Sequence, residues 1–173
     1  MIKVLFDTSV LVASILVNHE QHSACISWLI RVKRGEIQGY IGTHTLAELY
    51  AILSAFPAKP RLSPQLVQQL IKENLDSFEI ISLTSDDYKA VINLMVTLNL
   101  RGGAIYDALI AYGSLKAEVD HLLTLNLKHF IRFGGRIEKI WLFWFLCGNE
   151  VYTDGFFVKI ALKVLPYKHF TIP

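Results

Sequence analysis

KVLFDTSVLV, residues 3–12, is an apolar run that contains a single carboxylate, Asp7. Residues 2–6, IKVLF, predict a short buried strand, and the residues after Asp7 predict a helix. An ionised Asp is rarely buried without a partner, and Asp is a poor strand residue. Its position at the end of a strand therefore indicates either a helix cap or part of a functional site.

The composition of the 173 residues is that of one apolar globular domain, with 53% hydrophobic and 18% charged residues. The net charge of +2 excludes a strongly basic surface, so any RNA would be bound by a local patch. Two cysteines provide neither a disulfide framework nor a zinc site. No uncharged run approaches the roughly 18 residues of a membrane span, and Asp7 interrupts the first apolar stretch too early for a signal peptide. We expect a cytoplasmic protein without a membrane segment.

Short strands alternate with helical segments as far as residue 133. This alternation predicts an α/β fold with a mostly parallel central sheet that is flanked by helices on both faces. In such sheets the functional site lies beyond the carboxyl ends of the strands. The predicted strands are residues 2–6, 38–42, 79–83 and 121–125. The predicted helices after the one that follows Asp7 are residues 19–35, 43–56, 63–78, 84–100 and 104–118.

Residues 134–173 differ from the rest because aromatic and β-branched residues dominate and the turn signals CGN and TDG divide them. Hairpin strands are expected there. Residues 136–143, RIEKIWLF, are expected to form the final strand of the main domain, and the remainder is interpreted as an atypical hydrophobic C-terminal extension. Its aromatic residues Trp141, Phe143, Trp144 and Phe145 are candidates for a contact surface.

Three carboxylates lie at or near the starts of predicted helices: Asp7, Glu48 and Asp107. Each has an ordinary explanation on its own. Asp7 fits an N-cap, Thr45 and Glu48 fit a capping box, and Asp107 complements a helix dipole.

Taken together, the same three carboxylates favour a metal site. Asp7 follows a strand end, and Asp107 lies in an apolar helix with no cation near it in the sequence. Carboxylates that converge repel one another unless a cation lies between them. Oxygen ligands suit Mg²⁺ or Mn²⁺, and such an ion promotes attack of water on phosphorus.

Three stretches, in this order, resemble the PIN-domain family and specifically the VapC-like ribonuclease toxins of prokaryotes: VLFDTSVLV, THTLAELYAIL and GGAIYDALIAYGSLKAEVDHLLTLNLKHF. The resemblance covers about residues 1–133. It implies a three-layer PIN-like fold and a metal-dependent endoribonuclease that hydrolyses RNA phosphodiester bonds. It also implies a homodimer and a cognate antitoxin protein.

By position, Asp7, Glu48 and Asp107 match the acidic metal-binding residues of this family. A fourth acidic position of the family falls in residues 124–130, TLNLKHF, where Asn126 or His129 replaces the acid. The resemblance therefore adds Asn126 to the catalytic set, as an amide that accepts a hydrogen bond or orients a water molecule.

Other residues are interpreted by their surroundings in the sequence. Thr8, Ser9 and Thr124 are expected to support the carboxylates. His44 and His129 are interpreted as structural histidines, and residues 85–87 as a helix start. The helical spacing of Trp28, Tyr50 and Phe56 predicts core positions. Arg101, Lys128 and Arg132 are candidates for phosphate contacts, with ordinary solvated charges as the alternative.

Two other classes of function stay open. A phosphotransferase or phosphatase of the haloacid-dehalogenase type also has Asp after its first strand, but it needs a second Asp at the position of Ser9. A PIN-fold binding module with weakened catalysis is compatible with the missing fourth acid. Such a module would show little dependence on Mg²⁺ or Mn²⁺.

Overall fold

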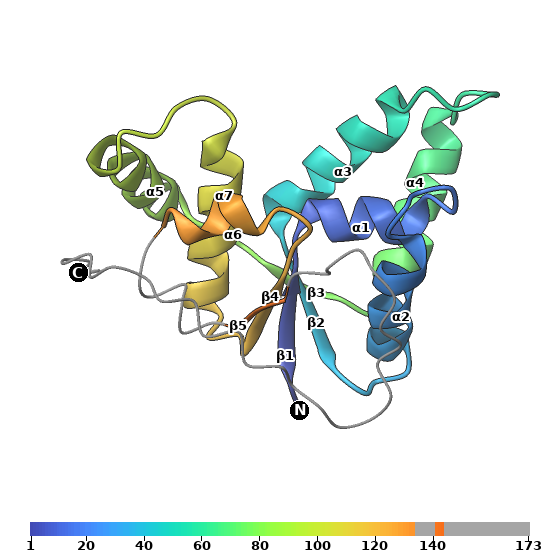
Figure 1. The fold of residues 1–173 in the computed structure, drawn as a ribbon, viewed down its shortest axis with the longest axis horizontal. Helices are drawn as coiled ribbons and strands as arrows, with labels where there is room; N and C mark the ends of the chain where they lie inside the picture. The colour runs from blue at the N-terminus through green and yellow to red at the C-terminus, as the bar shows by residue number, and fades with distance from the viewer. Residues whose placement is uncertain (134–140, 144–173) are drawn as a thin grey trace.

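The computed structural model describes residues 1–133 and 141–143. These residues form a five-stranded sheet in the order β3-β2-β1-β4-β5, and the four pairings between neighbours are all parallel (Figure 1). The predicted parallel sheet is confirmed, and a final strand lies inside the predicted range 136–143. The strands are β1 (Lys3–Phe6), β2 (Gln38–Gly42), β3 (Glu79–Ile81), β4 (His121–Leu123) and β5 (Trp141–Phe143).

Helices cover both faces of the sheet and give the predicted three layers (Figure 1). Alternate residues of β1 point to opposite faces, because side chains of a strand alternate. Val4 and Phe6 pack toward α1–α4, and Leu5 packs toward α5–α7. The helices are α1 (Thr8–Ile15), α2 (His22–Lys33), α3 (Thr43–Ala55), α4 (Pro64–Leu75), α5 (Ser85–Thr97), α6 (Ala104–Lys116) and α7 (Leu127–Ile131).

Helix starts follow the local sequence signals. Ser63 is the N-cap of α4, where its side chain accepts a hydrogen bond from the amide of Leu66 and Pro64 takes the first helical position. Thr84 and Asp87 form a complete capping box at α5, which confirms residues 85–87 as a helix start. Helix α7 was not predicted, because five residues are too short to show a helical period.

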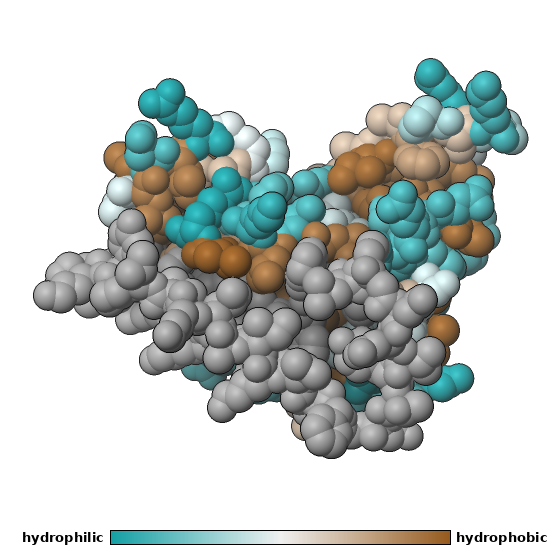
Figure 2. Space-filling view, viewed as in Figure 1, coloured by the Kyte–Doolittle hydropathy of each residue, from teal (hydrophilic) through white to brown (hydrophobic). Residues whose placement is uncertain are grey.

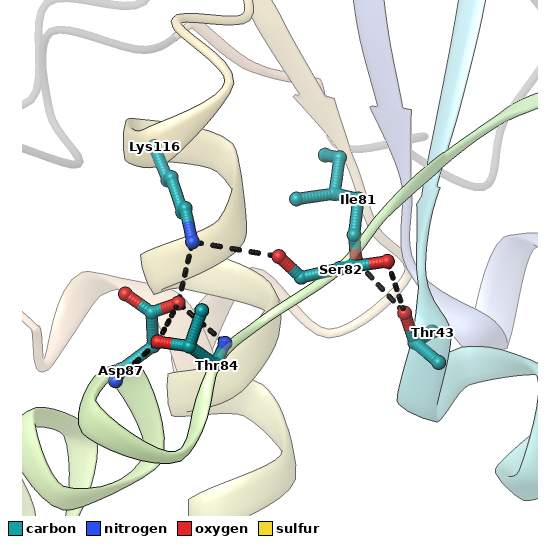
Figure 3. Close-up of polar contacts among 6 residues, drawn as sticks. All are labelled: Thr43, Ile81, Ser82, Thr84, Asp87 and Lys116. Atoms are coloured by element: carbon teal, nitrogen blue, oxygen red, sulfur yellow. Dashed lines mark hydrogen bonds and ion pairs between the residues drawn. The ribbon is translucent and has the colours of Figure 1, made fainter.

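A polar network joins the start of α3, the end of β3, the start of α5 and the end of α6 (Figure 3). Thr43 donates to the carbonyl of Ile81 across 3.1 Å, and Lys116 Nζ lies 2.5 Å from Asp87 Oδ2 and 3.4 Å from the Ser82 carbonyl. The hydrogen bond from Lys116 lowers the pKa of Asp87 to about 2. The network thus links α3 and α6, which carry the second and third predicted site carboxylates, to the residues at and after the end of β3.

The core differs from the sequence prediction at one position. Tyr50 is 43% exposed on α3, so its core assignment is wrong, whereas Trp28 and Phe56 are half-buried. The pattern misleads because the outer face of α3 carries apolar residues as well as the inner one.

Two further expectations concern membrane-spanning helices and the residues after position 133. No helix in residues 1–133 or 141–143 has the length and apolar character needed to cross a bilayer. The expected hairpins, with Trp144 and Phe145, lie outside the described residues, and the domain boundary at residue 133 stays a prediction.

Candidate functional site

The predicted site residues all lie at or beyond the carboxyl ends of three adjacent strands. Asp7 directly follows β1, Glu48 lies on α3 after β2, and Asn126 follows β4. Asp107 comes from the first turn of α6, on the other face of the sheet. The amide of Asp7 donates to the carbonyl of Leu123 across 2.9 Å, which continues the β1–β4 ladder into the site. Hydrophilic side chains line the floor of a hollow between α7 and α3 on this side of the molecule (Figure 2).

Asp7 is a buried carboxylate, only 5% exposed. Its Oδ2 accepts hydrogen bonds from Ser9 Oγ at 2.6 Å and from Thr124 Oγ1 at 2.7 Å. Burial raises the pKa of Asp7, the two hydroxyls counteract this effect, and the charges of Asp107 and Glu48 raise the pKa further. The charges of Glu48 and Asp107 thus both act on the buried carboxylate of Asp7.

The helix-cap explanation does not account for the Asp7 side chain. Asp7 has the backbone conformation of the N-cap of α1, but its side chain makes no capping hydrogen bond. Its carboxylate is instead fixed by a loop that also holds the start of α7. In that loop Leu125 donates from its amide to Ser9 Oγ, and Asn126 donates to Thr124 Oγ1. The predicted supporting hydroxyls thus contact the site directly.

Glu48 is held by Thr8, whose Oγ1 donates to Glu48 Oε2 across 2.5 Å. The alternative explanation of Glu48 as part of a capping box with Thr45 does not hold, because Gly42 and not Thr45 is the N-cap of α3. Thr45 Oγ1 is buried and has no hydrogen-bond partner in the described part of the chain. Glu48 is consequently free of any helix-capping role.

His44 lies beside Glu48, with its Nε2 4.0 Å from Glu48 Oε2. Its ring makes an edge-on contact with the ring of Tyr106, with centroids 5.4 Å apart. Burial lowers the pKa of His44, while the Glu48 charge opposes that shift. This environment fits the structural role that the sequence predicts for His44.

Asp107 has two basic neighbours that the sequence analysis missed. Arg132 Nη2 donates to Asp107 Oδ2 across 2.7 Å, and His129 Nδ1 lies 3.3 Å from the same oxygen. His129 on α7 and Arg132, the C-cap of this helix in αR conformation, are three residues apart and so lie on one side of it. The signal in the sequence was this spacing, which has a meaning only once residues 127–131 are known to be helical.

Asn126 stands exposed at the N-cap position of α7, next to the site. Its recorded contacts are those of its backbone: the amide donates to Thr124 Oγ1, and the carbonyl accepts from the amide of His129. Its side chain makes no capping hydrogen bond. The catalytic role of its amide therefore stays a prediction, as do phosphate contacts by the exposed Arg101 and Lys128.

The donor set suits a hard divalent cation. Asp7, Glu48 and Asp107 offer only oxygen atoms, and their mutual repulsion at a buried position is what a cation relieves. Within residues 1–133, no three His, Cys, Asp or Glu side chains stand as a ready-made ligand set. The contacts explain this, since Glu48 Oε2 is turned to Thr8 and Asp107 Oδ2 to Arg132.

Comparison with known structures gives the fold. The chain is similar to VapBC2 of Rickettsia felis bound to a DNA fragment from its promoter, with a TM-score of 0.59 and 22% identity, covering 83% of this chain and 99% of that one. It is also similar to FitAcB of Neisseria gonorrhoeae, with a TM-score of 0.57 and 16% identity, covering 81% of this chain and 96% of that one.

Comparison of sequences gives the family. Ribonuclease VapC40 of Mycobacterium tuberculosis is 31% identical over 122 residues, which are 70% of this chain and 85% of the relative. Ribonuclease VapC27 of the same organism is 29% identical over 114 residues, 66% of this chain and 78% of the relative. The sequence model of the PIN domain matches residues 3–128. With carboxylates converging at the strand ends and this match over most of its length, the chain belongs to the PIN-domain family.

Proposed function

We propose that this protein is an endoribonuclease that hydrolyses RNA phosphodiester bonds with Mg²⁺ or Mn²⁺. The observation that carries the proposal is the placement of three acids around the end of β1. Asp7 is buried directly after this strand, Glu48 is hydrogen-bonded to the adjacent Thr8, and the charges of Glu48 and Asp107 both raise the pKa of Asp7. Relatives named as ribonucleases support the same reaction class. The haloacid-dehalogenase alternative has no support, since Ser9 donates to Asp7 in place of a second acid.

Each residue of the site has a role in this proposal. Asp7, Glu48 and Asp107 would hold the ion, and a bound ion would supply Lewis acidity toward water and toward the charge on the phosphate. Ser9 and Thr124 orient the Asp7 carboxylate, and they do so without adding charge. Thr8 orients Glu48 in the same way. These neutral donors favour the ionised forms of Asp7 and Glu48 without cancelling their charge, and that charge would attract a cation.

We propose that the protein acts in the cytoplasm as the toxin of a toxin–antitoxin pair, as a homodimer that binds a cognate antitoxin protein. The similarity to VapBC2 supports the choice of partner. The surface of α3 and α4 offers contact area, since Tyr50, Ile52 and Leu66 are large exposed apolar side chains on these helices.

The reaction is tested on a mixed pool of tRNA and ribosomal RNA. Wild type is expected to cut it with Mg²⁺ or Mn²⁺ and to stop with EDTA, and Asp107→Asn is expected to remain folded and inactive. Asp86→Asn is the matched control, because Asp86 is an exposed acid on α5 that pairs only with exposed Lys89 within the described residues. Absence of cleavage by folded, antitoxin-free wild type would favour the binding module, with Asn126 in place of the fourth acid as the cause.

A further inference from the structure

The guanidinium of Arg132 is fixed at the site and is not an ordinary surface charge. Its Nη2 donates to Asp107 Oδ2 at 2.7 Å, and its Nε donates to the carbonyl of His129 at 2.7 Å. Its carbon Cζ also lies 5.5 Å from the centre of the Phe133 ring, and Phe133 is buried. Contacts on three sides hold the group in one place, although the side chain keeps 32% of its surface exposed.

The three carboxylates are stabilised in two different ways. Asp7 and Glu48 accept hydrogen bonds from neutral hydroxyls, whereas Asp107 faces a permanent cation. Arg stays protonated at any physiological pH. With His129 beside Asp107 counted as neutral, the three carboxylates and Arg132 carry a formal charge of −2, which is the charge that one divalent cation balances.

We infer that the site holds one divalent cation and that Arg132 supplies the second positive charge, which it directs at the phosphate of the RNA. The inference rests on the proposed function and specifies its metal content. A second divalent cation bound by Asp107 would lie next to the guanidinium of Arg132. Like charges that close repel strongly where the surroundings are partly buried.

The remaining hydrogen-bonding capacity of Arg132 suits this task. A guanidinium has five N–H donors, and the two bonds to Asp107 and to the His129 carbonyl use two of them. The fork geometry matches two oxygens of a phosphate, which a lysine matches less well. Arg132 would therefore contact the phosphate of the RNA, while Asp107 holds the guanidinium of Arg132 in position.

The first experiment counts bound Mn²⁺ on the full chain by electron paramagnetic resonance and by calorimetry, without RNA. Wild type is expected to bind one ion per chain. Arg132→Gln makes the local formal charge more negative, from −2 to −3, and is expected to bind a second Mn²⁺ at saturation. Arg132→Lys keeps the positive charge and is expected to bind one Mn²⁺. Arg34→Gln is the matched control, because Arg34 forms a surface pair with Glu36 just after the end of α2.

The second experiment measures RNA cleavage by the same variants. Arg132→Gln is expected to lose about 10²-fold in kcat/KM, the usual effect of removing one charge-stabilising donor. Arg132→Lys should recover part of that loss.

The possible failures are distinguishable. Two ions on wild type, or one ion on both wild type and Arg132→Gln, would overturn the inference and leave the nuclease intact. No Mn²⁺ bound by folded wild type, with no cleavage, would overturn the proposed function itself. Full cleavage by Arg132→Gln would contradict the phosphate contact alone.

Discussion

Thr124 donates a hydrogen bond to Asp7 across 2.7 Å and so joins two residues that are 117 positions apart in the chain. The bond is buried, and the same hydroxyl accepts from the amide of Asn126 at 2.9 Å. One side chain therefore links the first strand, the fourth strand and the start of α7. Several expectations about stability and activity depend on contacts of this kind.

Thr124→Val should destabilise the protein by about 1.5–3 kcal/mol, the usual value for a hydrogen bond to a charged group. It should also lower cleavage by about 10–100-fold, because a carboxylate that holds a metal depends on its supporting hydrogen bonds. Urea unfolding and RNA cleavage measure the two effects. Thr124→Ser keeps the hydroxyl and should retain most of the stability and most of the cleavage activity. Equal losses in Thr124→Val and Thr124→Ser would mean that the methyl group of Thr124 matters and not its hydroxyl.

Asp7→Asn should abolish cleavage and yet stabilise the protein in EDTA, by about 0.5–2 kcal/mol. Without a cation, the buried carboxylate is repelled by Asp107 and Glu48, and the amide removes that repulsion while it can still accept from Ser9 or Thr124. The change in melting temperature in EDTA shows whether Asp7→Asn stabilises or destabilises the protein, with Asp86→Asn as the surface control. A lower melting temperature for Asp7→Asn would show that the hydroxyl bonds outweigh the repulsion.

Asp87 should make stability depend on acid. Its pKa of about 2 in the folded protein is below the ordinary 3.8, because Lys116 and the capping box favour the ionised form. The contribution of Asp87 to the free energy of unfolding is therefore present above about pH 4 and is lost as the pH falls toward 2. Asp87→Ala should cost about 1 kcal/mol at pH 6 through loss of the cap, and should show a shallower loss of stability from pH 4 to pH 2.

Urea midpoints measured at several pH values check this expectation about Asp87. Asp86→Ala, one position earlier on the same helix, removes only an exposed pair with Lys89 and should keep the wild-type slope. Identical slopes for wild type and Asp87→Ala would contradict the assigned role of Lys116.

Gly39→Ala should destabilise the protein by about 1–3 kcal/mol through overpacking. A Cβ at this position of β2 would come within 2.7 Å of Val32 and 2.8 Å of Phe78, and both neighbours are buried. Gly103→Ala is the matched control, because a Cβ there meets nothing within 4 Å and the backbone φ is −59°. Chemical unfolding of both variants measures the difference, and equal stability would mean that the β2–α2 contact relaxes without cost.

The fold could be predicted from the sequence because its signals are local. The alternation of short apolar strands with helical periods gave the parallel sheet, and Ser63 and Thr84 marked two helix starts that the structure confirms. The core assignment of Tyr50 was wrong, because a helical period shows which residues lie on one face but not which face is covered.

The site was predictable only in part. Asp7, Glu48 and Asp107 were found because they recur at helix starts, and the structure brings their charges together. Arg132 was noted as a possible phosphate ligand, but its contact with Asp107 depends on a five-residue helix and on a sequence separation of 25. A tertiary contact between residues so far apart produces no periodic pattern in the sequence.

The strand order also determines when the site is complete during synthesis. β4 pairs with β1 on the side opposite to β2, although the chain forms β2 and β3 in between. A nascent chain that ends at residue 120 carries all three carboxylates but lacks the hydroxyl of Thr124 and the guanidinium of Arg132. An enzyme that cuts RNA thus acquires Thr124 and Arg132, which hold Asp7 and Asp107, only after its own message has been read well past the codons for the acids.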